Sequence, residues 1–466
     1  MNFIKKMKNI ILQILFLILV LNLTSSKLIS VIEVNRHGAR SAENFPEEYL
    51  QQFFGIAMKL TQNGYRQHQL LGTYMNDRYI KTGFIHKKYR PEDFEIISTP
   101  TQRTIFSADG FVSGLYPGYV VKVTNRDPSF PLVENDTIPV PNPPRRFNEI
   151  PLKVLSKAEN SFYNPWACKL QGVDLKKNSE NKTIFPNILP ISDEDMEYTA
   201  KYLAEYFNVT KSVSETSAEK FVKAAMKYVV PYFYHYGLKM EEKLPKKVAD
   251  VIKKMYVNKW YNARLKDNKL LKIGASEFLE IIKNSFKKAI TASQKPFLKK
   301  NGGFTKYTVY SSHDTPIVNL IANLVDEETL RNIIENSVQD QKAYDFLVPP
   351  FASHILFELH NSKDSKNNNG YYVSIYYNGK LLNYPIRGLE SMEFDGKIPF
   401  NDFVRFIENR VDNDYKKLVC VDGMREEKFE LFPIFEKKKD KIIGPSDFKL
   451  MSQLISLHRI IMDNNN

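Results

Sequence analysis

A histidine near the N-terminus lies between two arginines, directly after a run of strand-forming residues. In the stretch VIEVNRHGAR, the run ends at Val34 and is followed by Arg36, His37 and Arg40. An isolated string of this kind is as typical of a solvated basic loop as of a binding site. Its interpretation therefore depends on whether other parts of the chain supply chemistry that fits the same place.

Two further polar clusters follow strand-like runs of the same kind. FEIIS (94–98) precedes a helical pattern that begins near Arg103, and YTVYSS (307–312) ends at His313 and Asp314. Strands that alternate with helices indicate a mostly parallel central sheet flanked by helices. Because ligands bind such sheets beyond the carboxyl ends of the strands, the clusters should meet at one edge. The expected site contains Arg36, His37, Arg40, Arg103, His313 and Asp314.

Three guanidinium groups around an imidazole suit a phosphate dianion. Their planar forks pair with phosphate oxygens two at a time and stay charged at every relevant pH. A histidine among them can act as base, acid or nucleophile. As a nucleophile, His37 would attack phosphorus and form a phosphohistidine, while Asp314 would protonate the departing alkoxide. Water would then hydrolyse this intermediate, with the same aspartate acting as base.

The sequence lacks the motifs of the competing chemistries. It contains no G-x-S-x-G, H-E-x-x-H, C-x-x-C or G-x-x-x-x-G-K-[ST] pattern. Metal-dependent phosphatases need clustered aspartate and histidine ligands, whereas the 8 histidines of this chain are dispersed. We therefore expect a reaction that uses no metal and no other cofactor.

The elements that must position these residues fall into distinct parts of the chain. We expect an α/β domain formed by residues 27–125 and 300–466, with residues 126–299 inserted as a mainly helical lobe. Beyond residue 345, the runs ILFELH and YYVSIYY predict antiparallel strands added at a sheet edge. The stretch LTQNGYRQHQLLGTYMNDRY predicts an amphipathic helix. Its inward face should hold Leu60, Leu70, Leu71 and Tyr74.

Residues 1–26 have the pattern of a secretory signal peptide. Lysines at positions 5, 6 and 8 precede an apolar run over residues 10–23, and small residues follow up to Ser26. This run is short for a membrane span, although an uncleaved anchor is the alternative interpretation. No other run reaches eighteen apolar residues, so we expect a secreted or lysosomal protein whose mature chain has no transmembrane anchor.

The net charge of the mature chain is basic but its lysines are dispersed. Removal of residues 1–26 takes away 3 lysines and no acids, so the formal charge falls from +13 to +10. Such a charge suits an anionic substrate. The lysine-rich stretches contain acidic residues, as solvated faces do, and we expect no nucleic-acid binding.

Cysteine and asparagine patterns fit an oxidising compartment. The chain has 2 cysteines, Cys168 and Cys420, and an even pair there predicts one disulfide. Sequons for N-glycosylation occur at Asn135, Asn181 and Asn208.

Several motifs together resemble the histidine acid phosphatase family of the phosphoglycerate mutase-like superfamily. They are RHGAR with the following Ser41 and Pro46, STPTQRTIFSA, and YSSHDTPI. The stretches LTQNGYRQHQLLG and PPFASHILFEL are also similar, so the resemblance spans nearly all of residues 28–420. It implies a secreted or lysosomal enzyme that hydrolyses small phosphate monoesters at acid pH without metal, on an α/β domain with a helical insertion.

The resemblance also implies a role for each matching residue. By position, His37 would be the nucleophile and Asp314 the proton donor. The phosphate would be bound by Arg36, Arg40, Arg103 and His313. The segment before Cys420 resembles one that is disulfide-linked to the middle of the chain in relatives, which implies a Cys168–Cys420 bond. His68 would be structural, and the same interpretation is given to His354 and His360.

The chain departs from the family pattern at a few places. Ala39 stands where animal lysosomal and prostatic relatives commonly carry Asp, which bears on substrate preference. Proline follows only at position 46, and the additional disulfides of the family are missing. Glu33, inside the first strand, has no assigned role. His86, His235 and His458 carry no local signal.

The sequence leaves two other functions open. A phytase-type enzyme for inositol phosphates is compatible with the basic charge, and a secreted, non-catalytic anion-binding protein is the alternative from another class. A mutase is disfavoured by the signal peptide. The physiological substrate is open, as is the choice between a monomer and a homodimer.

Overall fold

The computed structural model describes about three fifths of the chain. It covers residues 26–41, 58–123, 148–155, 188–207, 217–235, 240–265, 268–294, 304–362, 370–390 and 395–412. The expected signal peptide, both cysteines and the three sequon asparagines lie outside the described residues. No helix within the described ranges is long and apolar enough to cross a membrane.

A nine-stranded sheet forms the centre of the molecule, in the order β3-β4-β2-β5-β1-β6-β7-β8, with β9 paired to β7. The strands are β1 (Lys27–Arg36), β2 (Phe94–Ser98), β3 (Tyr119–Val123), β4 (Asn148–Val154), β5 (Tyr307–Ser312), β6 (His354–Asn361), β7 (Tyr371–Tyr377), β8 (Lys380–Leu381) and β9 (Ile398–Pro399). The ladder from β3 to β1 is parallel, and the strands beyond β1 are antiparallel. The predicted mixed α/β fold with a mostly parallel sheet is confirmed, as are the antiparallel strands beyond residue 345.

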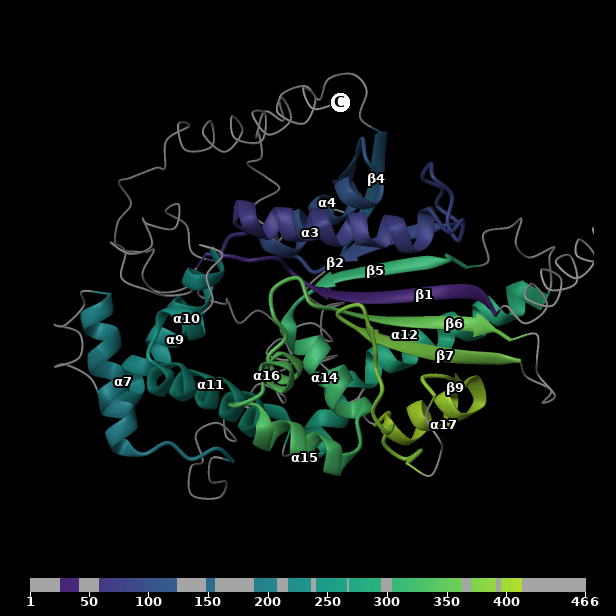
Figure 1. Cartoon of the computed structure of the whole chain (residues 1–466). Helices are drawn as coiled ribbons and strands as arrows, with labels where there is room; N and C mark the ends of the chain where they lie inside the picture. The colour runs from purple at the N-terminus through teal and green to yellow at the C-terminus, as the bar shows by residue number, and fades with distance from the viewer. Residues whose placement is uncertain are drawn as a thin grey trace, which may run out of the picture.

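Helices cover both faces of this sheet (Figure 1). One face carries α3 (Gln62–Met75), the π-helical turn η2 (Asn76–Ile80) and α4 (Gln102–Leu115). The other face carries α12 (Asn268–Gln294), α14 (Asp314–Leu324), α15 (Glu327–Asn336), α16 (Gln341–Leu347) and α17 (Phe400–Arg410).

Alternation along β1 supplies side chains to both faces. Val31 belongs to the hydrophobic cluster under α3 and α4, whereas Ile32 and Val34 belong to the cluster under α12 and α14. The central strand therefore contributes apolar side chains to both faces, as expected for a buried strand of a largely parallel sheet.

A group of helices lies to one side of the sheet and has its own hydrophobic cluster (Figure 1). It contains α7 (Asp193–Tyr206), α9 (Ala218–His235), α10 (Met240–Lys243) and α11 (Lys246–Trp260), and the π-helical turn η5 (Tyr261–Leu265) continues α11. These helices lie within residues 126–299. Strand β4, however, lies inside the range 126–299 and pairs with β2 and β3, so part of that range belongs to the sheet.

The inward face of α3 differs from the expectation. Leu60 and Leu71 are buried, but Leu70 is 60% exposed and Tyr74 is 40% exposed, so their predicted inward orientation is wrong. The buried face of the helix contains Gly64, His68, Leu71, Gly72 and Met75. Small and polar residues that permit close packing against α4 thus occupy positions that a hydrophobic pattern assigns to larger side chains.

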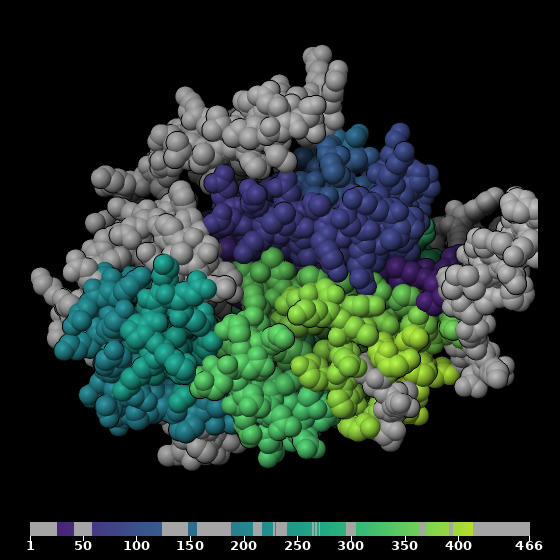
Figure 2. All heavy atoms as spheres, in the orientation of Figure 1, coloured from purple at the N-terminus to yellow at the C-terminus, as the bar shows by residue number. Residues whose placement is uncertain are grey.

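Segments far apart in the sequence form one surface. In Figure 2, the purple atoms of the N-terminal helices meet the green and yellow-green atoms of later segments along a line across the molecule. The teal atoms of the helices after residue 190 lie at the left of the molecule in this view.

A carboxyl group is buried in the middle of β1. The side chain of Glu33 is fully buried and accepts hydrogen bonds from the Tyr307 hydroxyl and, at 3.2 Å, from Asn35 Nδ2. Burial raises the pKa of Glu33 to about 7, because desolvation outweighs the two hydrogen bonds that lower it. The Tyr307 ring lies 4.9 Å from that of Tyr79, whose hydroxyl donates to Glu358, so a polar network continues across this face.

This carboxyl group should make the fold more stable in acid. Between its ordinary pKa of 4.5 and the folded pKa of about 7, the folded protein keeps a proton that the unfolded chain releases. The free energy of unfolding therefore falls as pH rises through this interval, by about 3 kcal/mol from this group alone. Between pH 5 and pH 8, the free energy of unfolding of Glu33→Gln should rise by about this amount relative to that of the wild type, as measured by urea unfolding. The exposed Glu149→Gln is the control, and a Glu33→Gln difference that is constant with pH would contradict the prediction.

Candidate active site

The parallel pairing of β1 with β5 brings the first and third polar clusters together. Arg36 is the register partner of Ser312, and the backbone N–H of His37 donates to the Ser312 carbonyl at 2.9 Å. His313 and Asp314 follow directly at the start of α14. Both segments therefore leave the sheet at the same edge, as the sequence predicts.

The second cluster joins them because β2 pairs with β5 on its other side. Arg103 is the second residue of α4, and its Nη2 lies 3.5 Å from His313 Nδ1. Arg40 is close enough for its charge to lower the pKa values of His37 and Asp314. The six residues selected from the sequence thus meet in one place.

His37 is 4% exposed and has a defined tautomer. Its Nδ1 lies 2.8 Å from the carbonyl oxygen of Gly38. A carbonyl can only accept, so Nδ1 carries the hydrogen and Nε2 keeps its lone pair. Burial lowers the pKa of His37 well below its ordinary value, and the charges of Arg103 and Arg36 lower it further. The ring therefore stays neutral at an acidity that protonates free histidine.

His313 has the opposite tautomer. Because a guanidinium group can only donate, Nδ1 of His313 accepts from Arg103, and its Nε2–H donates to Thr99 Oγ1 at 3.1 Å. The rings of His37 and His313 lie edge to face with centroids 5.5 Å apart. Burial and the charge of Arg103 lower the pKa of His313 well below its ordinary value. The cluster thus presents a neutral histidine pair surrounded by arginines.

Arg36 connects the cluster to Asp314 and to the loop before β6. Its Nη2 forms an ion pair with Asp314 Oδ2 at 3.0 Å, and its Nη1 donates to the Pro349 carbonyl. Its guanidinium carbon lies 4.2 Å from the centre of the Phe351 ring. Within the described residues, the buried Nε of Arg36 has no hydrogen-bond partner. A buried donor of this kind is a candidate for binding a ligand.

Asp314 is ionised in the free protein. Burial raises its pKa, but the charges of Arg36 and Lys259 outweigh this effect and lower it to about 2. Its side chain is 30% exposed, so the carboxylate is open on one side. Lys259 belongs to the last turn of α11, so the helical group beside the sheet contributes positive charge to the site.

Side chains from α3 and α4 hold the backbone of residues 37–39, which we call the histidine loop. The N–H groups of Gly38 and Ala39 donate to Ser107 Oγ at 3.0 Å and to Gln67 Oε1 at 2.8 Å. His68 Nε2 donates to the Arg36 carbonyl at 2.9 Å, and burial lowers the pKa of this histidine to about 4. His68 therefore contacts the backbone of the site.

Not every residue that the sequence singled out faces the site. The side chain of Ala39 is completely buried. His354 is buried in β6, and His360 lies at its far end, stacked on Tyr372 with ring centroids 4.9 Å apart.

Two glycines allow α3 to reach the histidine loop. A Cβ on Gly38 would lie 2.1 Å from the Gly64 carbonyl oxygen, and a Cβ on Gly64 would lie 2.1 Å from the Ala39 carbonyl oxygen. Real Cβ atoms do not approach backbone atoms this closely. The loop and the helix are therefore in direct backbone contact.

Gly64→Ala should disrupt the site although alanine favours helix. In an exposed helix interior this change stabilises by about 1 kcal/mol, but here the new methyl must displace α3 or the loop. We expect a net loss of roughly 2 kcal/mol or more in the free energy of unfolding, typical of overpacking, with a large loss of any activity at the site. Thermal unfolding and activity assays measure both, and the exposed Thr73→Ala is the control. Unchanged stability and activity would contradict this packing.

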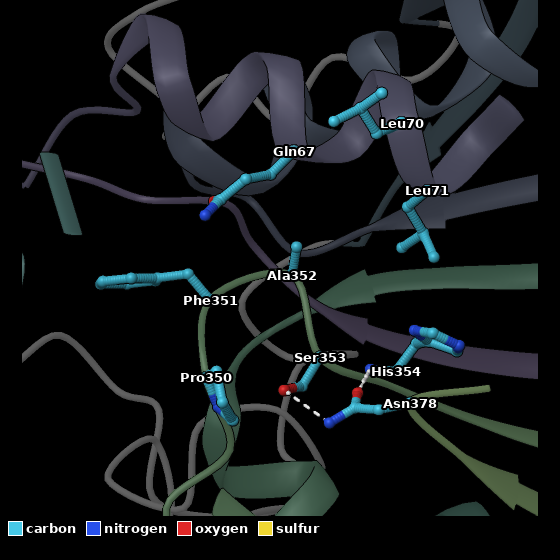
Figure 3. Close-up of a pocket in the computed structure, with 9 residues that line it drawn as sticks. All are labelled: Gln67, Leu70, Leu71, Pro350, Phe351, Ala352, Ser353, His354 and Asn378. Carbon is cyan, nitrogen blue, oxygen red and sulfur yellow. Dashed lines mark hydrogen bonds between the residues drawn. The ribbon is translucent and has the colours of Figure 1, made fainter. Parts of the chain in front are cut away.

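A hollow of about 370 Å³ lies beside the cluster (Figure 3). Gln67, Leu70 and Leu71 of α3 line one side of it, and the loop that includes Phe351 lines the other. Because Phe351 also contacts Arg36 and His37, its ring is shared between the hollow and the cluster.

Four residues that contact the site were not predicted from the sequence: Gln67, Thr99, Ser107 and Phe351. Each lies within or next to a motif used above, but nothing in residue type or spacing distinguishes it. Among the described residues, no group of three or more His, Cys, Asp or Glu side chains could hold a metal ion.

The chain was compared with known protein families to identify the family to which it belongs. The sequence profile of the histidine phosphatase superfamily (branch 2) matches residues 42–378, well over half of the chain. The chain belongs to this superfamily. The match begins just after Arg40, so the histidine phosphatase assignment does not itself depend on the RHGAR motif.

Curated relatives in the histidine phosphatase superfamily include acid phosphatases. Human prostatic acid phosphatase is 25% identical over 364 residues, which are 76% of this chain and 78% of the relative. Bovine prostatic acid phosphatase is 34% identical over 113 residues, and rat lysosomal acid phosphatase is 32% identical over 111 residues. These two alignments span only 28% and 25% of the relatives.

Solved structures of the same fold include phytases. The phytase of Hafnia alvei in complex with myo-inositol hexakis sulphate matches with a TM-score of 0.53 at 13% identity, covering 84% of this chain and 98% of the phytase. A multiple inositol polyphosphate phosphatase of Bifidobacterium longum matches with a TM-score of 0.51 at 13% identity, covering 84% and 93%. At this identity the likeness shows the fold.

Proposed function

We propose that this member of the histidine phosphatase superfamily is an acid phosphatase that hydrolyses phosphate monoesters through a phosphohistidine at His37. The observation that carries this proposal is a buried, neutral His37 whose Nε2 holds a lone pair, surrounded by Arg36, Arg103 and Arg40. Arginines attract the phosphate dianion, and the neutral imidazole attacks it.

Four residues bind the phosphate in this proposal. Arg36 contributes the buried Nε that has no partner among the described residues, and His313 lies between Thr99 and Arg103 with its ring fixed. These residues would orient the phosphate group for attack by His37 without a metal ion. The phosphate-binding set is Arg36, Arg40, Arg103 and His313.

Asp314 donates the proton to the leaving group, although its pKa is about 2 in the free protein. Substrate binding changes this pKa because the phosphate brings negative charge next to the carboxylate and competes for Arg36. Both effects favour the protonated acid. At acid pH, Asp314 takes up a proton with the substrate, passes it to the departing oxygen and later removes one from the attacking water.

The substrate is a small phosphate monoester in this proposal, and no cofactor takes part. A phytase-type activity is the second candidate, supported by the solved phytases and inositol polyphosphate phosphatases that share the fold. A non-catalytic anion-binding role is disfavoured because His37 and Asp314 are both in place.

The cellular location and the covalent modifications of the protein are part of the same proposal. A secreted or lysosomal location agrees with the names of the relatives, which include lysosomal acid phosphatases. The signal peptide, the glycosylation of Asn135, Asn181 and Asn208, and the Cys168–Cys420 disulfide rest on the sequence alone.

Hydrolysis of p-nitrophenyl phosphate at about pH 5, with and without excess EDTA, tests the proposed chemistry. We expect activity that chelation does not reduce, and a trapped phosphoenzyme that is labile to acid and stable to alkali, as a phosphohistidine is. A panel of aryl phosphate, phosphotyrosine, lysophosphatidate and phytate then separates the two candidate functions. Activity that EDTA removes and Zn²⁺ or Mg²⁺ restores would overturn the mechanism.

A further inference from the structure

Phe351 lies in the loop between α16 and β6 and is only 6% exposed. The guanidinium carbon of Arg36 is 4.2 Å from its ring centre, and the ring centroid of His37 is 5.7 Å away. One aromatic ring thus contacts both the expected nucleophile and an expected phosphate ligand.

The backbone of this loop is fixed to the same two residues. The N–H of Arg36 donates to the Ser353 carbonyl at 2.8 Å, and the N–H of Ala352 donates to the His37 carbonyl at 3.2 Å. Ala352 has a positive φ of 61°, an uncommon backbone conformation for alanine. This turn directs the Phe351 ring back over the residues to which the loop is hydrogen-bonded.

Contact with the Phe351 ring does not use a hydrogen-bond acceptor, because the ring has no oxygen or nitrogen atom to pair with the N–H groups of Arg36. A guanidinium group stacks on an aromatic ring through its face, whereas its N–H groups point outward in the plane. In the free protein Arg36 is also held by Asp314 and by the Pro349 carbonyl. A bound phosphate competes with Asp314 for Arg36. Of the guanidinium contacts within the described residues, those to the Pro349 carbonyl and the Phe351 ring then remain, and they come from the 349–351 loop.

We propose that Phe351 is a positioning residue of the phosphate site, whose ring orients Arg36, and with it the bound phosphate, against His37. This inference rests on the proposed function. It assigns a role to an apolar loop residue that makes no hydrogen bond to the phosphate. It also predicts that the aromatic character of the side chain matters, beyond its size.

The experiment compares Phe351→Leu with Phe351→Tyr in the full-length protein. Leucine keeps an apolar side chain but loses the aromatic face, whereas tyrosine retains it. From the usual strength of cation–π contacts, we expect Phe351→Leu to weaken binding of inorganic phosphate by about 3- to 30-fold. KM for p-nitrophenyl phosphate should rise in parallel, with a smaller change in kcat. Phe351→Tyr should stay within about twofold of the wild type, because its ring gives the same cation–π contact.

Phe346→Leu is the matched control. Phe346 is also 6% exposed and lies in α16, five positions earlier, but its ring packs on Tyr377 and Tyr384. Loss of packing alone would affect both leucine variants, so the control should lose stability without losing phosphate affinity. If Phe351→Leu does not fold, Phe351→Met tests the same point with an unbranched apolar side chain.

The outcomes separate this inference from the proposed function. A folded leucine or methionine variant that binds phosphate as the wild type does overturns the positioning role, as does an equal loss in Phe346→Leu. A wild type that binds phosphate with this dependence on Phe351, yet hydrolyses no ester, supports the positioning role and overturns the proposed function. A wild type that binds no phosphate overturns both.

Discussion

Replacement of His37 by alanine is expected to abolish hydrolysis of aryl and alkyl phosphates alike. The change removes the nucleophile, because the lone pair of His37 Nε2, whose tautomer the Gly38 carbonyl fixes, is lost with the imidazole. Loss of a nucleophile typically lowers kcat by roughly 10³-fold or more. The measurements are steady-state kinetics and labelling of the phosphoenzyme, which should disappear.

The arginines should still bind inorganic phosphate in His37→Ala, which shows that the site remains assembled. His360→Ala is the control, because His360 lies in the same sheet at the opposite end of β6 and stacks on Tyr372. It should keep both activity and label. Persistence of the phosphoenzyme in His37→Ala would show that another residue is the nucleophile.

Asp314→Asn should affect substrates according to their leaving groups. An alkoxide needs a proton in the transition state, and general acid catalysis typically contributes about 10²- to 10⁴-fold. p-Nitrophenolate leaves without that help. The phosphorylation step should therefore slow far more for β-glycerophosphate than for p-nitrophenyl phosphate. Single-turnover formation of the phosphoenzyme measures this step apart from the hydrolysis step that both substrates share.

The amide keeps the size of the carboxyl group and removes the negative charge opposite Arg36, so phosphate binding should not weaken. Asp326→Asn is the control: Asp326 caps α15 through the Thr329 N–H, and asparagine caps a helix equally well. This control should leave both substrates unaffected. Equal slowing of the two substrates by Asp314→Asn would show that Asp314 is not the acid for the leaving group.

The convergence of the site could be predicted from the sequence because sheet geometry enforces it. Strand-like runs before His37 and His313 imply neighbouring parallel strands, and their ends must then share an edge. Charged residues at those ends are visible by type alone. The tautomers of the two histidines could not be predicted, because they depend on backbone and side-chain partners from other segments.

Three features of the structure could not be predicted from the sequence. Phe351 contacts Arg36 through its ring. A phenylalanine in a loop belongs to no motif that would predict such a contact. Strand β4 contains Pro151 and follows a proline-rich stretch, so its short alternating pattern does not by itself predict a strand of the sheet. The orientation of α3 cannot be predicted from hydrophobic periodicity, because its contact face contains the glycines Gly64 and Gly72.

The place of β1 in the sheet has a consequence for how the chain folds as it is synthesised. Among the strands that the structure describes, β1 is synthesised earliest, yet its neighbours are β5, at residues 307–312, and β6, at residues 354–361. Its backbone N–H and C=O groups and its apolar side chains therefore lack their native partners until residues 307–361 have been made. Pairings across such distances are slow to form and leave intermediates prone to aggregation.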